Sequence, residues 1–168
     1  VNAQGWNTAV SPVQMPVAVQ GIAAGTVVAC LANRRANTEA IVVRRADTSD
    51  AVTMATSNNK DLYLQVARCT LDVQRLVAAA VPTSTPEATF NLRMPDCATF
   101  NNRLRRLTQR TYYIASCNDC AANDGIPTLK RVEMIDGTLR TVSIAEGVEN
   151  LQVEYGLDNN PAHPARGD

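Results

Sequence analysis

Alternating apolar and polar positions are the strongest structural signal in this chain. Across residues 150–157 every second side chain is apolar, which predicts a half-buried strand whose apolar set faces the core. These apolar positions are Leu151, Val153, Tyr155 and Leu157. Upstream, Asp136-Gly137 separates two extended runs and favours a type I′ hairpin turn, because both central residues of that turn need φ above zero. Residues 124–158 therefore predict a β-meander.

Most of the remaining chain also predicts short strands. Extended segments are expected at residues 41–43, 61–68, 88–94 and 110–115, which are β-branched, aromatic or alternating. In the second segment Leu62, Leu64 and Val66 alternate with Tyr63, Gln65 and Ala67; in the third the apolar set is Phe90, Leu92 and Met94, ended by Pro95. The N-terminal thirty residues are apolar but broken by Gly and Pro, so we expect irregular extended chain there.

One segment predicts a helix instead of a strand. Its apolar residues recur at helical spacing, and Pro82 follows as a stop. They are Val73, Leu76, Val77 and Ala80. The expected fold class is therefore mainly β, with an antiparallel sheet and little helix.

Composition narrows the function classes. The formal net charge of the 168 residues is zero, so the overall balance gives no argument for a nucleic-acid partner. The basic residues are almost all arginines, since Lys60 and Lys130 are the only lysines. The five cysteines, in number and scatter, favour an oxidising compartment.

The cysteines allow two interpretations of the Cys-Asn-Asp-Cys unit at Cys117 and Cys120. A redox pair would open a helix after a strand, where the helix N-terminus lowers the pKa of the first thiol. The residues that follow contain Gly125 and Pro127 and favour a turn, so we expect a structural disulfide. Cys69 and Cys97 each follow a strand-like segment and form the favoured second pair, which leaves Cys30 as the odd cysteine.

Catalytic chemistry finds little support in the sequence. His163 is the single histidine, and it lies between Pro161 and Pro164, a poor scaffold for a general base that must be held rigidly. A zinc site needs about four Cys or His ligands, and a second close cysteine pair is missing. No Gly-rich phosphate loop occurs. We therefore expect no enzyme activity and no cofactor.

A run of arginines offers the main candidate for a charged surface. The run comprises Arg103, Arg105, Arg106 and Arg110. Phosphate contact is one interpretation. The favoured alternative is a solvated strand edge, where charge discourages edge-to-edge aggregation, because Tyr112 and Tyr113 are the only flanking stacking aromatics. No nucleic-acid partner is expected.

The amino-acid sequence of the C-terminal third resembles that of a known family. The segments IPTLKRVE and IAEGVENLQVEYGLD, joined by a short turn, resemble the PilW family of type IV pilus assembly proteins, which are minor pilins. The resemblance is strongest from Arg106 to Asp158, and weaker at IVVRRAD and at GWN near the start. Residues 48–100 match no family motif.

The resemblance implies a larger parent protein. PilW-like proteins begin with a hydrophobic helix, so the family is α+β, and they usually continue past YGLD with another strand. We therefore expect residues 1–168 to form one pilin-like globular domain, truncated at both ends and lacking its N-terminal helix. A partner for Cys30 upstream of Val1 is implied as well, and membrane contact only through the missing helix.

The resemblance also implies a loop after the last strand that is similar to an EF-hand calcium loop. Asp158 and Asn160 take its first and third positions, but Ala162 and His163 stand where a ligand and the turn glycine belong. Asp168 is a further weak candidate. No metal site is expected.

The expected function is structural. The resemblance implies a minor pilin that takes part in pilus assembly or priming at the pilus tip, with other minor pilins and the major pilin as partners. It implies the Gram-negative inner membrane and periplasm before assembly, and the extracellular pilus afterwards. The alternative is a tip adhesin or ligand-binding module using residues 48–100, and the third is a thiol-disulfide oxidoreductase using Cys117 and Cys120.

Overall fold

The computed structural model describes residues 17–49, 51–100 and 102–156. Seven strands form one antiparallel sheet, and helix is almost absent, as predicted from the sequence. The strands are β1 (Val19–Ile22), β2 (Ala40–Ala46), β3 (Leu62–Val66), β4 (Leu76–Ala80), β5 (Arg105–Ala115), β6 (Thr128–Ile135) and β7 (Thr138–Glu146). A 3-10 turn η1 (Met54–Thr56) and one short helix α1 (Pro86–Thr89) complete the regular elements.

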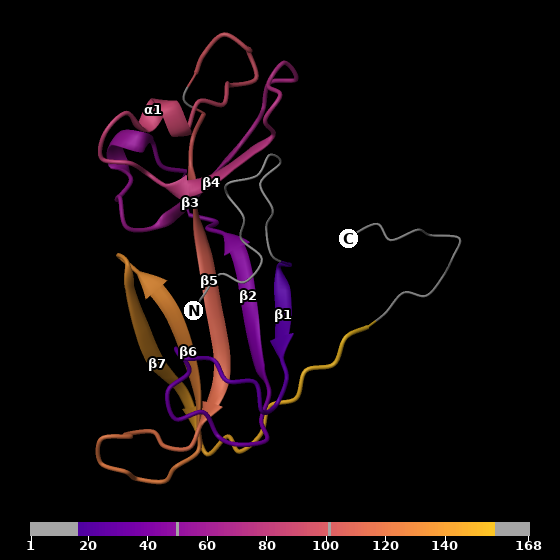
Figure 1. Ribbon diagram of the computed structural model, residues 1–168, viewed down its shortest axis with the longest axis vertical. Coiled ribbons are helices and arrows are strands. Elements are labelled where there is room, and N and C mark those ends of the chain that lie inside the picture. Colours follow the sequence, from indigo (N-terminus) through magenta and orange to yellow (C-terminus); the bar gives the residue numbers. More distant parts are fainter. Residues whose placement is uncertain (1–16, 50, 101, 157–168) are drawn as a thin grey trace.

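Strand β5 organises the sheet because it is the longest strand and lies between β2, β3 and β6 (Figure 1). β2 pairs with β5 and carries β1 on its outer side. β6 pairs with residues 110–115 of β5 and carries β7, whereas β3 pairs with Arg105 and Arg106 and carries β4. The β3–β4 hairpin and the β6–β7 hairpin thus lie at different heights along β5 (Figure 1).

Two hydrophobic clusters hold the strands. The upper cluster lies between β3, β4 and the segment after α1, and comprises Tyr63, Val77, Val81, Phe90, Leu92 and Leu104. The lower cluster lies between the sheet and the loop of residues 23–37, and comprises Leu31, Ala40, Tyr113, Ala115 and Val132. The Tyr113 hydroxyl donates to the carbonyl of Ala32 at 3.0 Å, and burial raises the pKa of Tyr113.

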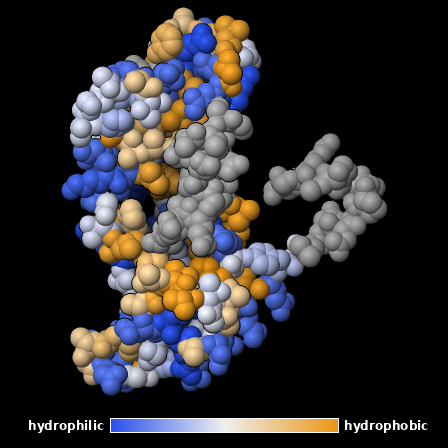
Figure 2. Space-filling model, viewed as in Figure 1, coloured by the Kyte–Doolittle hydropathy of each residue, from blue (hydrophilic) through white to orange (hydrophobic). Residues whose placement is uncertain are grey.

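The surface carries many apolar side chains besides these clusters. Figure 2 shows hydrophobic residues interspersed with hydrophilic ones over the whole visible face. Val27 in the 23–37 loop and Val73 before β4 are almost fully exposed. Scattered apolar residues are normal on a soluble protein, so only a contiguous or ordered set carries an argument.

Two predicted elements are wrong. Residues 76–80, expected as a helix, form β4, because pairing with β3 outweighs the helical spacing of the apolar residues. Residues 88–94, expected as a strand, form the end of α1 and an irregular segment, since Pro86 is suited to the first turn of a helix. Phe90 and Leu92 are nevertheless fully buried there, while Met94 is only partly buried.

The alternation in β3 does not separate a buried apolar face from an exposed polar one. Tyr63, Leu64 and Gln65 are all buried, whereas Leu62 and Val66 are exposed. The buried amide is satisfied, since its Nε2 donates to the carbonyl of Asn102 at 2.7 Å and its Oε1 accepts from the N–H of Leu92 at 3.0 Å. Gln65 thereby joins β3 to the segments at Leu92 and Asn102.

Candidate interaction surface

The β6–β7 hairpin is closed by the turn predicted from Asp-Gly. Ile135 pairs with Thr138, so Asp136 and Gly137 form a two-residue loop, and both have positive φ (51° and 72°). The Asp136 side chain accepts from Asn58 Nδ2 at 3.1 Å, and its N–H donates to Asp61 Oδ1 at 3.1 Å. The hairpin prediction is confirmed, and the turn is bound to the loop before β3.

Strand β7 presents an open edge. All nine of its residues are exposed, and within the part of the chain that the structure describes it pairs with β6 alone. Its large apolar side chains are Leu139, Val142 and Ile144, with exposed fractions of 43%, 41% and 47%. Natural proteins protect such edges with charged side chains, Pro, β-bulges or short strands. β7 contains no Lys or Pro, but it carries Arg140 and an irregular register where Ser143 and Ala145 pair with Lys130 and Leu129.

The chain after β7 departs from the prediction. Residues 150–156 are not a strand, and Tyr155 is exposed at 58% instead of buried. Leu151 and Val153 are half-buried, and the segment is held by the N–H of Glu39 donating to the Leu151 carbonyl at 3.0 Å. Within the described part of the chain, residues 150–156 pair with no strand. Leu157 lies outside the described residues.

The tyrosine at the end of this segment marks a close approach to β1. Its hydroxyl accepts from the N–H of Gly21. A Cβ built on Gly21 would lie 2.7 Å from that hydroxyl, so the glycine leaves room for Tyr155. The segment from β7 to Tyr155 thus crosses from one side edge of the sheet to the other (Figure 1).

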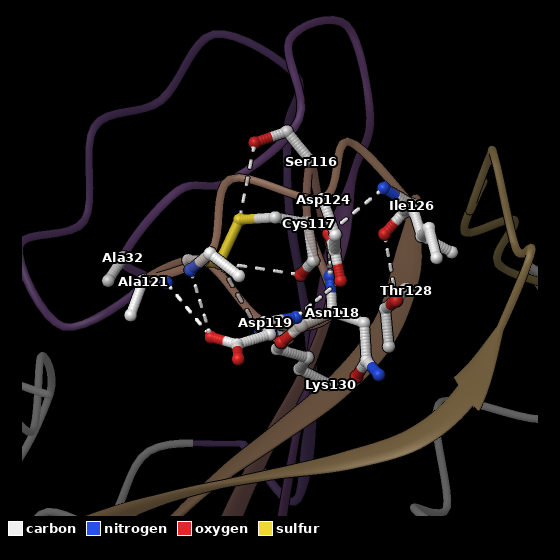
Figure 3. Close-up of a disulfide and its surroundings, with 12 residues drawn as sticks. Ala32, Ser116, Cys117, Asn118, Asp119, Ala121, Asp124, Ile126, Thr128 and Lys130 are labelled. Atoms are coloured by element: carbon white, nitrogen blue, oxygen red, sulfur yellow. Dashed lines mark hydrogen bonds between the residues drawn. A yellow bond between two sulfur atoms is a disulfide. The ribbon is translucent and has the colours of Figure 1, made fainter.

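Cys117 and Cys120 are joined by a disulfide in the loop between β5 and β6 (Figure 3). The carboxylate of Asp124 accepts from the N–H groups of Asn118 (3.0 Å) and Asp119 (2.7 Å), which hold its pKa below the usual range together with the N–H of Ile126. Lys130 Nζ donates to the Asn118 carbonyl at 2.8 Å. These bonds fix the loop onto the sheet.

The same loop is bound to β7. Asn118 Nδ2 donates to Glu146 at 2.6 Å, and the Ser143 hydroxyl donates to Asn118 Oδ1 at 2.7 Å. β7 is therefore anchored at its start by the Asp136 turn and near its end by the disulfide loop. Sequence reasoning missed these anchors, because they join residues far apart in the chain.

The disulfide loop lacks the geometry of a thiol oxidoreductase. Residues 117–125 form turns and bends, so no helix N-terminus lies at Cys117 to lower the pKa of its thiol. Cys117 is also buried. The second disulfide joins Cys69 to Cys97 beside the upper cluster, and Cys30 is the one free cysteine. These are the two pairs favoured from the sequence.

The arginine run is not a solvated strand edge. Arg105, Arg106 and Arg110 lie in β5, which has neighbours on both sides. Arg106 pairs with Asp47 at 2.9 Å and lies 3.7 Å from Asp61, and Arg110 pairs with Glu133 at 2.8 Å. The exposure of Arg103, Arg105 and Arg106 agrees with the prediction, but the predicted strand edge is wrong because β5 is an interior strand. The carboxylate partners follow β2, lie in β6 and precede β3, which the local sequence does not reveal.

The Glu133 carboxylate shows how these arginines are accommodated. Burial alone raises the pKa of Glu133, but hydrogen bonding to Arg110 and the charge of Arg131 reverse that effect and lower it. Arg131 donates to the other carboxylate oxygen at 2.7 Å. The buried acid thus neutralises two arginines on one face of the sheet.

The described residues contain no cluster of side chains suited to bind a metal ion. No group of three or more His, Cys, Asp or Glu side chains there is arranged to hold an ion. The weak calcium candidates Asp158, Asn160 and Asp168, and His163 as well, lie outside the described residues.

No helix among the described residues combines the length and the apolar character needed to cross a bilayer.

Comparison with known families agrees with the resemblance seen in the sequence. Residues 111–166 match the PilW family, described as Type IV Pilus-assembly protein W. The match begins in β5 and includes the disulfide loop, β6 and β7. No curated protein and no solved structure matches the chain. The match supports a role related to type IV pilus assembly, in a family that is not a known enzyme family.

Proposed function

From this family match, we propose that the chain is part of a minor pilin that takes part in assembly or priming at the tip of a type IV pilus. Its role is structural: it binds other pilus subunits and catalyses nothing. The partners we propose are other minor pilins and the major pilin. The proposed location is the inner membrane and periplasm before assembly and the extracellular pilus afterwards, which agrees with two disulfides.

The observation that carries the proposal is the open edge of β7 inside the matched region. An exposed strand edge offers a row of backbone N–H and C=O groups that an extended segment of another protein can pair with. The apolar side chains of Val142 and Ile144 would add contact area beside that backbone pairing. We propose β7 as the surface that receives a strand of a neighbouring subunit.

The anchoring of β7 favours such a role. The turn at Asp136 is bonded to Asn58 and Asp61, and Glu146 at the other end is bonded to Asn118. A strand held at both ends loses little conformational freedom when a partner binds, so less of the binding free energy is spent on ordering it. The Cys117–Cys120 disulfide serves the edge by fixing the loop that holds it.

The test is co-purification of the full-length protein with other pilus subunits from native envelope extracts. The edge variant replaces Val142 and Ile144 with lysine, which places charge on the edge. The matched control replaces Leu71 and Val73, which are also exposed, with lysine. We expect the edge variant to lose the subunits and the control to retain them, with both folded. Retention by the edge variant would contradict the proposed surface.

A tip adhesin remains the second candidate because of the region around the Cys69–Cys97 disulfide. Leu71, Val73 and Phe100 are exposed there at 67%, 99% and 58%, far from β7 in the topology. If adhesion is the main role, the Leu71/Val73 variant loses attachment to surfaces while pili still form. The oxidoreductase alternative predicts insulin reduction that depends on Cys117, and we expect none.

A further inference from the structure

A cationic pocket lies where β3, the start of β5 and the segment before η1 meet. Its volume is about 360 Å³. The apolar part of its lining is Ala51, Leu64, Val66 and Met94, and the polar part is Asn102 with three arginines, Arg68, Arg103 and Arg105. No carboxylate of the described residues lines it.

Strand register explains why the three guanidinium groups meet. Leu64 pairs with Arg105, so the two side chains leave the same face of the sheet. Side chains alternate along a strand, which puts Arg103 on the face of Arg105, and Arg68 on the face of Leu64 as the chain continues past β3. Asn102 Nδ2 donates to the carbonyl of Val66 at 2.7 Å and joins the segment before β5 to the end of β3.

The cations of this pocket differ from the other arginines of the run. Arg106 and Arg110 are paired with carboxylates, whereas Arg68 and Arg103 form no side-chain hydrogen bond or ion pair with any described residue. Arg105 donates to the carbonyl oxygens of Ser49 and Asp47, which orients it and leaves its carboxylate-binding capacity unused. Three like charges around one hollow favour an anionic ligand.

We propose that this cationic pocket binds an acidic peptide segment, in which a carboxylate side chain lies beside an aliphatic one. Guanidinium groups bind carboxylates through paired N–H donors, and the floor of Leu64, Val66 and Met94 accepts the aliphatic neighbour. No aromatic residue lines the pocket among those that the structure describes, so these residues offer no platform on which nucleic-acid bases stack. The pocket lies off β7 and does not depend on the pilus role.

The test is an NMR titration of the chain with the peptide Ac-Leu-Glu-Leu-Glu-NH2. Its neutral counterpart with Gln in place of Glu serves as one control, and oligo-dT as another. The pocket variant is Arg68→Gln with Arg103→Gln. It removes two positive charges whose side chains make no bond with any described residue. The control variant, Lys60→Gln with Arg140→Gln, removes the same charge from outside the pocket.

We expect the Glu peptide to shift the amide signals of residues 64–68 and 102–105, and the Gln peptide to leave them in place. The pocket variant should bind the Glu peptide about tenfold more weakly or worse, and the control variant as the unaltered chain does. Equal binding of both peptides, equal binding by both variants, no binding, or tighter binding of oligo-dT at the same residues would each overturn the proposal.

Discussion

Replacing Gly137 with valine tests how the turn between β6 and β7 is built. Gly137 has φ of +72°, where a side chain costs about 1–2 kcal/mol because Cβ approaches the following carbonyl oxygen. A Cβ at this position would also lie 3.1 Å from Cβ of Lys60, which is tighter than ordinary packing. Crowding of this kind costs about 1–3 kcal/mol. We therefore expect Gly137→Val to lower the free energy of unfolding by about 2–5 kcal/mol.

Gly147 provides a matched control. Its φ is +75°, almost the same, but no atom lies within 4 Å of the position its Cβ would take. Gly147→Val should therefore show the backbone cost alone, about 1–2 kcal/mol. Urea unfolding followed by far-UV circular dichroism, with unchanged m-values, gives both numbers. If Gly147→Val costs as much as Gly137→Val, the contact between the turn and Lys60 contributes nothing and the reasoning is refuted.

Three other predictions concern cysteines, packing and pH. Non-reducing peptide mapping should find the disulfides Cys69–Cys97 and Cys117–Cys120, and a mixed pairing would contradict the fold. Their residues are 28 and 3 positions apart, so losing the first should lower the free energy of unfolding by about 3.5 kcal/mol and losing the second by about 1.5 kcal/mol. Phe90→Ala should cost about 3–5 kcal/mol and Leu151→Ala about 1 kcal/mol, because only the first is fully buried; equal costs in urea unfolding would contradict this. The N–H of Ser49 and the Arg106 guanidinium lower the pKa of Asp47 from its usual value of 3.8 to about 2. The ionised carboxylate therefore contributes stability that is present above pH 3.8 and is lost as the pH falls toward 2. In acid unfolding, Asp47→Asn should weaken this loss.

The sequence predicted the turns and strands whose conformation depends on neighbouring residues. The Asp136-Gly137 turn needs two residues with positive φ, and the sequence supplies the pair that adopts it most readily. The β-branched run at Ile41–Val43 lies in β2 as expected. The turn residues after Cys120 predicted a loop closed by a structural disulfide, and the loop contains the Cys117–Cys120 disulfide.

Partners distant in sequence decided the rest. Residues 76–80 have an apolar spacing that a helix and a strand both accommodate, and only the pairing with β3 selects the strand. The alternation at residues 150–156 forms no ladder, and the chain bonds to Glu39 instead. The arginines of β5 find Asp47 and Glu133 through the topology of the sheet. The open edge of β7 is likewise visible only once the strand order is known.

Hydrogen exchange along β7 tests the central claim most directly. The amides to follow lie in Thr138–Glu146, measured by mass spectrometry in the full-length protein alone and in complex with its co-purified pilus subunits. On one side β7 pairs with β6, and on the other it is open, so about half of its amides should exchange rapidly in the protein alone. We predict that the complex slows exchange of those amides by tenfold or more, as strand pairing requires. Unchanged exchange in β7, with protection confined to residues 67–100, would contradict the account.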